Sequence, residues 1–122
     1  MSGVLIVDDL EFMRTALREI LEKEGISVVG EAVNGLEGLK LYGELAPRVV
    51  LLDITMPEMD GLSALRKIRR RDPASQIIMC SAMGQEDIIL KAIRHGARDF
   101  VVKPFKPERI VSAVRKALYD GR

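Results

Sequence analysis

Apolar residues in this chain occur in two alternating kinds of segment. Short, nearly continuous apolar runs predict buried strands, and they lie at Gly3–Val7, Ile26–Ala32, Val49–Asp53, Ile77–Cys80 and Asp99–Val102. The longer segments between them repeat apolar residues three or four positions apart, as amphipathic helices do. We expect helices between Asp9 and Gly25, from Gly35 to about Leu45, from about Gly61 to Arg71, from about Glu86 to His95, and from Pro107 onwards.

Two of these helices have apolar stripes that predict the burial of single side chains. The stripe of the first helix contains Phe12, Met13, Ala16, Leu17, Ile20 and Leu21. The stripe of the fourth helix contains Ile88, Ile89, Ala92 and Ile93. Leu90 falls about 130° from the centre of that stripe, at about 100° per residue. We therefore expect the stripe residues to be buried and Leu90 to be exposed or only partly covered.

Strands that alternate strictly with helices predict a parallel sheet with helices on both of its faces. The second strand is less uniformly apolar than the others, as an edge strand can be. No internal repeat, low-complexity stretch or linker interrupts the alternation. We expect a single domain over residues 1–122, with no output domain attached.

Composition limits the function classes. The 122 residues are 48% hydrophobic and 30% charged, which is typical of a globular domain. A net charge of +1 provides no general attraction to nucleic acid or to an anionic membrane. The one dense basic run, residues 66–71, has no aromatic neighbours that could stack on bases, so we interpret it as a solvated helix face. The absence of a membrane-length apolar stretch and of a signal peptide favours a cytoplasmic protein.

The apolar run Val49–Leu52 leads directly into Asp53. Pro57 cannot continue a central strand, and Asp60–Gly61 is typical of a turn, so Asp53 is expected at the carboxyl end of a buried strand. Ligands of open α/β sheets bind at that edge. The alternative is that Asp53 only caps nearby amides at the strand end.

Polar residues also follow the other apolar strands: Asp8 and Asp9 after the first, Ser81 after the fourth and Lys103 after the fifth. Parallel strands place all of these ends along one edge. Three carboxylates brought together repel one another unless a cation joins them, and Mg²⁺ prefers oxygen ligands completed by water. The sequence therefore predicts a Mg²⁺ site, and Lys103 indicates that an anion also binds there.

A carboxylate beside Mg²⁺ and an ammonium group can attack phosphorus and form an aspartyl-phosphate. In this hypothesis Asp53 is the nucleophile, and Ser81 donates a hydrogen bond to a phosphoryl oxygen. Each residue also has a simpler interpretation. Asp8 and Asp9 could cap the first helix, Ser81 could be a turn residue, and Lys103 could be a solvated surface lysine.

Five motifs together resemble the receiver domain of two-component response regulators over essentially the whole chain, and in particular the chemotaxis regulators that consist of this domain alone. They are Leu5–Asp9, Asp53–Gly61, Cys80–Gly84, Gly96–Phe100 and Val102–Phe105. The resemblance implies an α/β, flavodoxin-like (βα)5 three-layer sandwich, whose five-stranded parallel sheet has the order 2-1-3-4-5. It also implies a cis peptide bond between Lys103 and Pro104.

The resemblance implies a role for each matching residue. Asp53 would accept a phosphoryl group from a histidine kinase. Mg²⁺ would be held by Asp8, Asp9, Asp53 and the backbone carbonyl of Thr55. Ser81 and Lys103 would contact the phosphoryl group. Ser81 and Phe100 would form the switch, and Leu90 and Phe100 would lie on the output face.

Three positions differ from the best-known enteric members of the family. Phe100 replaces a common tyrosine, so the hydroxyl contact of that tyrosine is missing. Thr55 and Met83 replace amide and acid side chains that position the hydrolytic water. The lifetime of the phosphoryl group therefore stays open.

The resemblance implies a monomeric signalling phosphoacceptor, which is not an enzyme but assists its own phosphorylation and dephosphorylation. Its expected partners are a histidine kinase of chemotaxis type and a flagellar motor switch protein or phosphatase, without nucleic acid or membrane. A phosphorelay intermediate or a sporulation-type regulator would have a similar sequence. A flavodoxin-type small-molecule binder is disfavoured because Asp8 and Asp9 repel phosphate. An aspartyl phosphatase would need an acid at position 55, and a receiver-like binder that is never phosphorylated would lack the acceptor or the acid pair.

Overall fold

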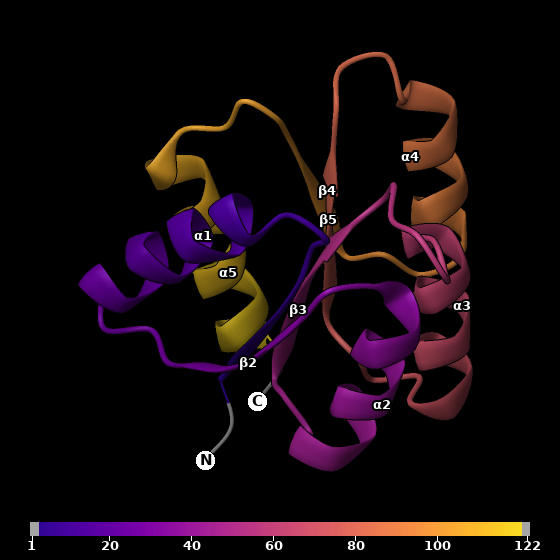
Figure 1. Cartoon of the computed structure of the whole chain (residues 1–122), viewed down its shortest axis with the longest axis horizontal. Helices are drawn as coiled ribbons and strands as arrows, with labels where there is room; N and C mark the ends of the chain where they lie inside the picture. The colour runs from indigo at the N-terminus through magenta and orange to yellow at the C-terminus, as the bar shows by residue number, and fades with distance from the viewer. Residues whose placement is uncertain (1–2, 121–122) are drawn as a thin grey trace.

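The computed structural model describes residues 3–120, along which strands and helices alternate (Figure 1). The strands are Val4–Val7 (β1), Val28–Ala32 (β2), Val49–Asp53 (β3), Ile77–Ser81 (β4) and Asp99–Val102 (β5). The helices are Glu11–Lys23 (α1), Gly35–Leu45 (α2), Gly61–Arg71 (α3), Glu86–Arg94 (α4) and Pro107–Asp120 (α5). The outermost residues of the expected domain, 1–2 and 121–122, lie outside the described residues.

The strands form one parallel sheet in the order β2-β1-β3-β4-β5, which confirms the expected fold class. The less apolar β2 lies at an edge, as expected. It begins at Val28 and not at Ile26, because the Ile26 amide donates to the Leu21 carbonyl and completes the end of α1. The peptide bond between Lys103 and Pro104 is cis, as the resemblance implied.

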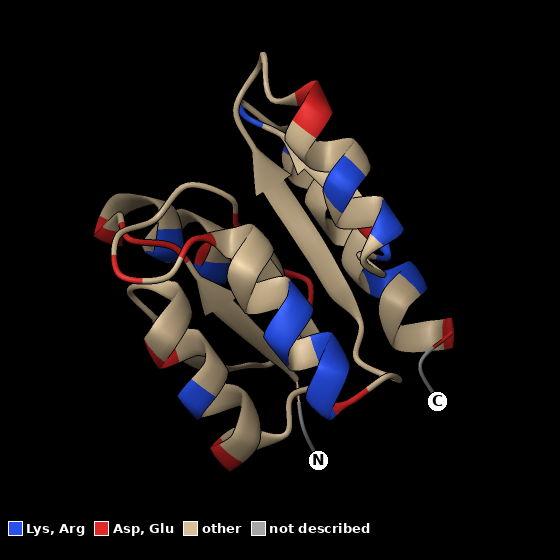
Figure 2. Ribbon diagram, turned by 90° about the vertical axis from the view of Figure 1, so that its right-hand side faces the viewer, with Lys and Arg blue, Asp and Glu red and all other residues tan. Residues whose placement is uncertain are grey.

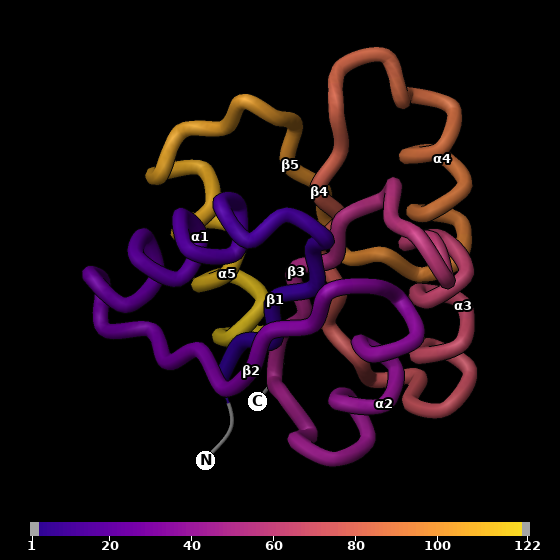
Figure 3. The backbone as a smooth tube through the Cα atoms, viewed as in Figure 1, coloured from indigo at the N-terminus to yellow at the C-terminus, as the bar shows by residue number. Residues whose placement is uncertain are grey.

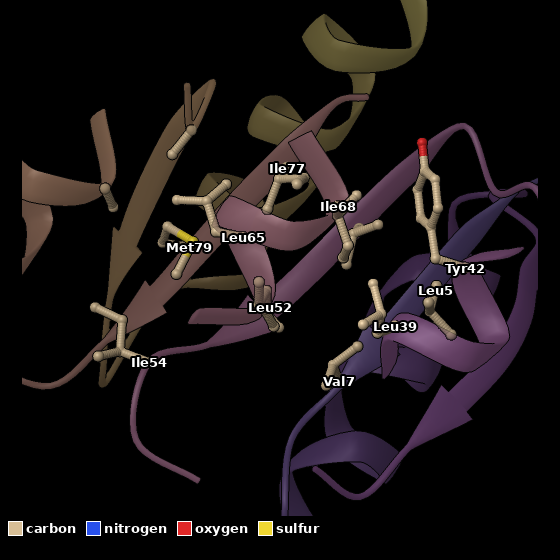
Figure 4. Packing of buried hydrophobic residues seen from close by; sticks show 14 of the residues in the cluster. Leu5, Val7, Leu39, Tyr42, Leu52, Ile54, Leu65, Ile68, Ile77 and Met79 are labelled. Carbon is tan, nitrogen blue, oxygen red and sulfur yellow. The ribbon is translucent and has the colours of Figure 1, made fainter. Parts of the chain in front are cut away.

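Helices cover both faces of the sheet, with α1 and α5 on one side and α2, α3 and α4 on the other (Figure 1). Each face therefore has its own apolar core. The core under α2, α3 and α4 is shown in Figure 4 and includes Leu52, Leu65, Ile68 and Met79. The core under α1 and α5 includes Leu17, Leu51, Ile78 and Ile110. None of the described helices combines the length and the apolar character needed to cross a membrane.

Two stripe residues that were expected to be buried are exposed, and Met13, Ala16, Ile20 and Ile88 are half-buried. Phe12 is 78% exposed because it lies in the first turn of α1, more than one turn before Leu17, and only Leu17 and Leu21 of this helix are fully buried. Ile93 is 42% exposed. The buried residues of α4 are Ile89 and Ala92, and the side chain of Ile93 points about 100° away from that of Ala92 around the helix axis. Leu90 is 57% exposed, which confirms that expectation.

Candidate functional site

Four strands, β1, β3, β4 and β5, have polar residues at or just after their carboxyl ends, and these ends lie along one edge of the sheet. Leu52 of β3 is paired with Val7 of β1, and Asp53 is paired with Cys80 of β4. Asp8 follows β1 directly, Ser81 is the last residue of β4, and Lys103 follows β5. Figure 3 traces the backbone through the loops that leave these strands. The topology thus brings to one edge the groups that the sequence spreads over nearly 100 residues.

Asp8, Asp9 and Asp53 form a cluster in which one carboxylate oxygen from each lies within 4.8 Å of the others. Asp8 and Asp53 are buried, whereas Asp9 is exposed. The cluster therefore has two ligand oxygens set into the protein and one at the solvent boundary. This arrangement confirms the expected meeting of the three carboxylates.

The ammonium group of Lys103 reaches into this cluster. Its Nζ donates to Asp8 Oδ2 at 3.2 Å and to Asp53 Oδ1 at 3.1 Å, and only 21% of the side chain is exposed. Lys103 is therefore not a solvated surface lysine. Burial by itself would lower the pKa of Lys103, but the charges and hydrogen bonds of Asp53 and Asp8 outweigh burial and raise it.

Asp53 has a raised pKa even with Lys103 as a neighbour. Burial is the main cause, the Lys103 charge opposes it, and the charges of Asp8 and Asp9 add to it. One ammonium group is insufficient to balance three carboxylates. A small divalent cation with oxygen ligands fits this donor set, since Mg²⁺ binds one or a few carboxylates and completes its shell with water.

Asp8 is held in place by local hydrogen bonds. Its Oδ1 accepts from the Leu10 amide at 2.9 Å, and its backbone carbonyl accepts from Arg14 Nη1 at 2.8 Å. Leu10 is the N-cap residue of α1 and has no side-chain capping bond, so Asp8 orders the loop before the helix and does not cap the helix itself. The second oxygen of Asp8 stays directed to Lys103.

The loop after Asp53 returns tightly to the strand. The Gly61 amide donates to the Ile54 carbonyl at 2.7 Å, and a Cβ at residue 61 would overlap the Asp53 carbonyl oxygen. Asp60 caps α3 by accepting from the Ser63 amide at 2.8 Å. The Asp60–Gly61 pair therefore fixes the backbone on which Asp53 is presented.

Ser81 is fully buried, and its hydroxyl has no hydrogen-bond partner among the described residues. Buried hydroxyls are normally paired, so an unpaired one next to a functional site needs an explanation. Its backbone carbonyl accepts from the Lys103 amide at 2.7 Å, which joins the ends of β4 and β5. An incoming oxygen acceptor would satisfy the hydroxyl.

Gln85 is a site residue that the sequence patterns missed. Its Nε2 donates to Thr55 Oγ1 at 3.0 Å, and its Oε1 accepts from the Ala82 amide at 2.6 Å. The side chain thus joins the β3–α3 loop, which follows Asp53, to the β4–α4 loop, which follows Ser81. Only its place just before a helix was visible in the sequence, because the partner Thr55 is 30 residues away.

Phe100 and Leu90, the two residues expected on the output face, are not part of the carboxylate cluster. Phe100 on β5 is half-buried and packs against the core under α2, α3 and α4. Leu90 on α4 is exposed, and so are Ile93 and Val102. These residues belong to the α4 and β5 side of the molecule and do not contribute to the polar cluster.

Comparisons with known proteins agree with this geometry. The family model described as "Response regulator receiver domain" matches residues 4–115. Chemotaxis protein CheY of Listeria monocytogenes is 53% identical over 96% of this chain and 98% of its own length. Chemotaxis protein CheY of Thermotoga maritima is also 53% identical, over 93% of this chain and 94% of its own length.

A solved structure is similar over nearly the whole fold. A chain of the CheX-CheY-BeF3-Mg²⁺ complex from Borrelia burgdorferi has a TM-score of 0.90 and 35% identity, covering 94% of this chain and 87% of that one. The match of the family model, the strand order and the near-complete coverage of the CheY relatives all agree. The chain belongs to the family of response regulator receiver domains.

Proposed function

We propose that this CheY-like response regulator accepts a phosphoryl group on Asp53 from a histidine kinase and signals through a protein-binding face in chemotaxis. The observation that carries the proposal is the Lys103 ammonium group 3.1 Å from Asp53, inside a cluster of three carboxylates. A lone acidic patch would have no reason to enclose a lysine 50 residues away in sequence. The protein acts as a phosphoacceptor that assists its own phosphorylation and dephosphorylation and is not an enzyme.

The chain's own residues have distinct parts in the transfer. A carboxylate oxygen of Asp53 forms a bond to phosphorus while the bond from phosphorus to the donor's histidine nitrogen breaks, and the electron pair stays on that nitrogen. Lys103 balances negative charge on the transferred group, and the unpaired Ser81 hydroxyl donates to a phosphoryl oxygen. Asp8, Asp9, Asp53 and the Thr55 carbonyl would hold Mg²⁺, which would supply further charge neutralisation.

Output follows from a coupling between Ser81 and Phe100. Ser81 moves towards the phosphoryl group, Phe100 turns inwards, and the face around Leu90 gains affinity for its partner. Phosphorylation has to favour the inward state, because a ligand shifts a two-state element only by its differential affinity. We propose a flagellar motor switch protein or a phosphatase as the partner. The CheX-CheY-BeF3-Mg²⁺ complex from Borrelia burgdorferi supports the coarser point that a protein of this family binds another protein.

Intact-mass spectrometry with acetyl phosphate tests the proposal. We expect one added phosphoryl group when Mg²⁺ is present, and no addition to the Asp53→Asn variant. Asp60→Asn is the matched control, because Asp60 is also a carboxylate of this loop but caps α3 outside the cluster. An adduct that forms equally well in excess chelator, or on Asp53→Asn, would contradict the proposed site.

A further inference from the structure

A second polar surface lies away from the carboxylates, between α3 and α4. A cleft of about 460 Å³ is lined by Arg66, Arg69, Arg70, Arg94, His95 and Gly96. A smaller hollow of about 240 Å³ adjoins it and is lined by Ser63, Arg66, Lys67 and Arg70. The two hollows share Arg66 and Arg70, so they form one run along α3, which we name the α3–α4 basic cleft. Figure 2 shows in blue the lysine and arginine positions along α3 and α4.

The cleft contains cations and no carboxylate among the described residues that line it. Elsewhere on the molecule arginines are paired with acids: Arg14 and Arg18 with Glu31, Arg98 with Asp120, Arg109 with Asp99 and Arg115 with Glu24. No ion pair is formed by the cleft's arginines with any described residue. The fold thus pairs these five arginines with acids, whereas the four arginines of the cleft have no carboxylate partner among the described residues.

Helix dipoles explain only part of this charge. Cations in the last turn of a helix are stabilised by the dipole, which accounts for Arg69, Arg70 and Arg94. Arg66 and Lys67 lie before the last turn of α3, beyond the range of that effect. Like charges three or four residues apart on one helix face also repel, so Arg66 and Arg70 destabilise each other without an anion.

One of the arginines is built into the wall of the cleft. Arg69 Nη1 donates to the Ser75 carbonyl at 2.8 Å, which holds the guanidinium group in place. Gly96, with a φ of +99°, follows α4, and a Cβ at that position would overlap Arg69 Nε. A side chain at residue 96 would therefore displace the guanidinium group from the wall of the cleft.

We propose that the α3–α4 basic cleft binds an acidic segment of a protein partner. Arginine forks match carboxylates in geometry as well as charge. Small-molecule sites are mainly apolar and enclosed, whereas the side chains of Arg66, Arg70 and Arg94 in this cleft are exposed and charged. The lining contains no aromatic side chain that could stack on a nucleobase. An extended chain rich in Asp and Glu fits these features.

Nuclear magnetic resonance of the full ¹⁵N-labelled chain tests this proposal, with hexaglutamate as the probe at low ionic strength. We expect amide shifts concentrated at residues 63–70 and 94–96, which weaken when salt is raised. The double variant Arg66→Glu, Arg70→Glu should weaken the apparent affinity for hexaglutamate by about tenfold or more. Arg66→Gln with Arg70→Gln should give a smaller loss, and its own spectrum reports whether the fold is intact.

The matched control reverses the same number of charges elsewhere. Lys23→Glu with Lys116→Glu changes exposed lysines beside the α1–α5 groove and should leave hexaglutamate binding nearly unchanged. Equal losses in both double variants, or shifts spread over all basic residues, would overturn the proposal. Binding of hexaglutamine as tight as that of hexaglutamate would also overturn it. So would a result in which tripolyphosphate binds to the cleft and hexaglutamate does not.

Discussion

Asp9 is the exposed member of the carboxylate cluster. Unlike Asp8 and Asp53, its side chain forms no hydrogen bond with a described residue. Asp8 is tied to Leu10 and Lys103, and Asp53 is tied to Lys103. A metal ligand that is free to adjust its position can complete the shell of an ion without straining the core. The contribution of Asp9 is therefore expected to be direct ligation and not support of the fold.

Asp9→Ala should weaken Mg²⁺ binding by about tenfold or more, a typical cost of disturbing a metal site. Glu11→Ala removes the same charge two residues away, from an exposed position in the first turn of α1. Its effect should be small, because an exposed charge acts on the site only through screened electrostatics. Calorimetric titration measures both affinities, and equal losses would show that ligation by Asp9 is not involved.

Gln85 determines how the two loops beside Asp53 are joined. In the Gln85→Ala variant both of its hydrogen bonds are lost, and Thr55 Oγ1 loses its partner. We expect the phosphoryl group on Asp53 to hydrolyse about fivefold faster, because one hydrogen bond contributes about 1 kcal/mol and its loss opens the site to water.

The decay of the phosphorylated species, followed by intact mass after the donor is removed, gives this rate. Glu86→Ala is the control, since Glu86 is the exposed neighbour of Gln85 and makes no hydrogen bond to a described residue. Identical decay in the Gln85→Ala protein and the unsubstituted protein would mean that the loop bridge does not protect the phosphoryl group.

At the scale of elements, ion pairs join α1 to the edge strand β2. Arg14 Nε lies 3.1 Å from Glu31 Oε1, and Arg18 Nε lies 2.6 Å from Glu31 Oε2. The Arg18 hydrogen bond is the main cause of a lowered pKa of Glu31, against a smaller opposing effect of burial. Glu31 is also connected to the functional site through Arg14, which donates one hydrogen bond to Glu31 and another to the Asp8 carbonyl.

The lowered pKa of Glu31 predicts a pH-dependent contribution to stability. A carboxyl group whose pKa is lower in the folded state stabilises the fold above its unfolded pKa, and that contribution is lost as pH falls through the folded pKa. Glu31→Gln should therefore reduce the free energy of unfolding at neutral pH by about 1 kcal/mol or less, since the pair is partly solvated.

Urea denaturation followed by circular dichroism measures this difference at neutral pH and again in acid below the lowered pKa, where it should disappear. Glu44→Gln is the control, because Glu44 is exposed and forms no ion pair with a described residue. A loss of equal size at both pH values would mean that packing, and not charge, makes the Glu31 contribution.

At the scale of the whole molecule, polar chemistry and exposed apolar side chains are separated. The carboxylates lie at the end of the sheet, while Leu90, Ile93 and Val102 are exposed on α4 and β5. Phe100 lies on the same strand as Val102 and packs inwards against the core. A change in packing around Phe100 can therefore reach the exposed side chains without any of them touching the phosphoryl site.

Leu90→Asp should weaken binding to the proposed flagellar motor switch protein by about tenfold or more, because a charge is then buried in an apolar contact. Phosphorylation of Asp53 should be unaffected in the same variant. Leu36→Asp on α2 is the control, since Leu36 is 54% exposed, similar to the 57% of Leu90. Fluorescence anisotropy with the labelled partner measures both variants, and normal binding by Leu90→Asp would exclude this face.

The sequence alone determined the order of strands and helices, the parallel sheet and the carboxylate at the end of its central strand. These features depend on local patterns: the period of apolar residues, the helix end at Gly25, and the apolar run into Asp53. Local patterns also predicted that Leu90 is exposed. The strand order and the cis bond before Pro104 came from the family resemblance and were confirmed.

The tertiary structure decided what depends on distance between remote residues. Lys103 meets Asp8 and Asp53, Gln85 meets Thr55, and α3 and α4 together form the basic cleft. Phe12 and Ile93 were wrongly predicted as buried, because a helical period gives the direction of a side chain but not how far the neighbouring layer extends to cover it. Burial of a side chain and its contacts depend on how the helices and the sheet pack together, and the spacing of apolar residues along the chain does not predict that packing.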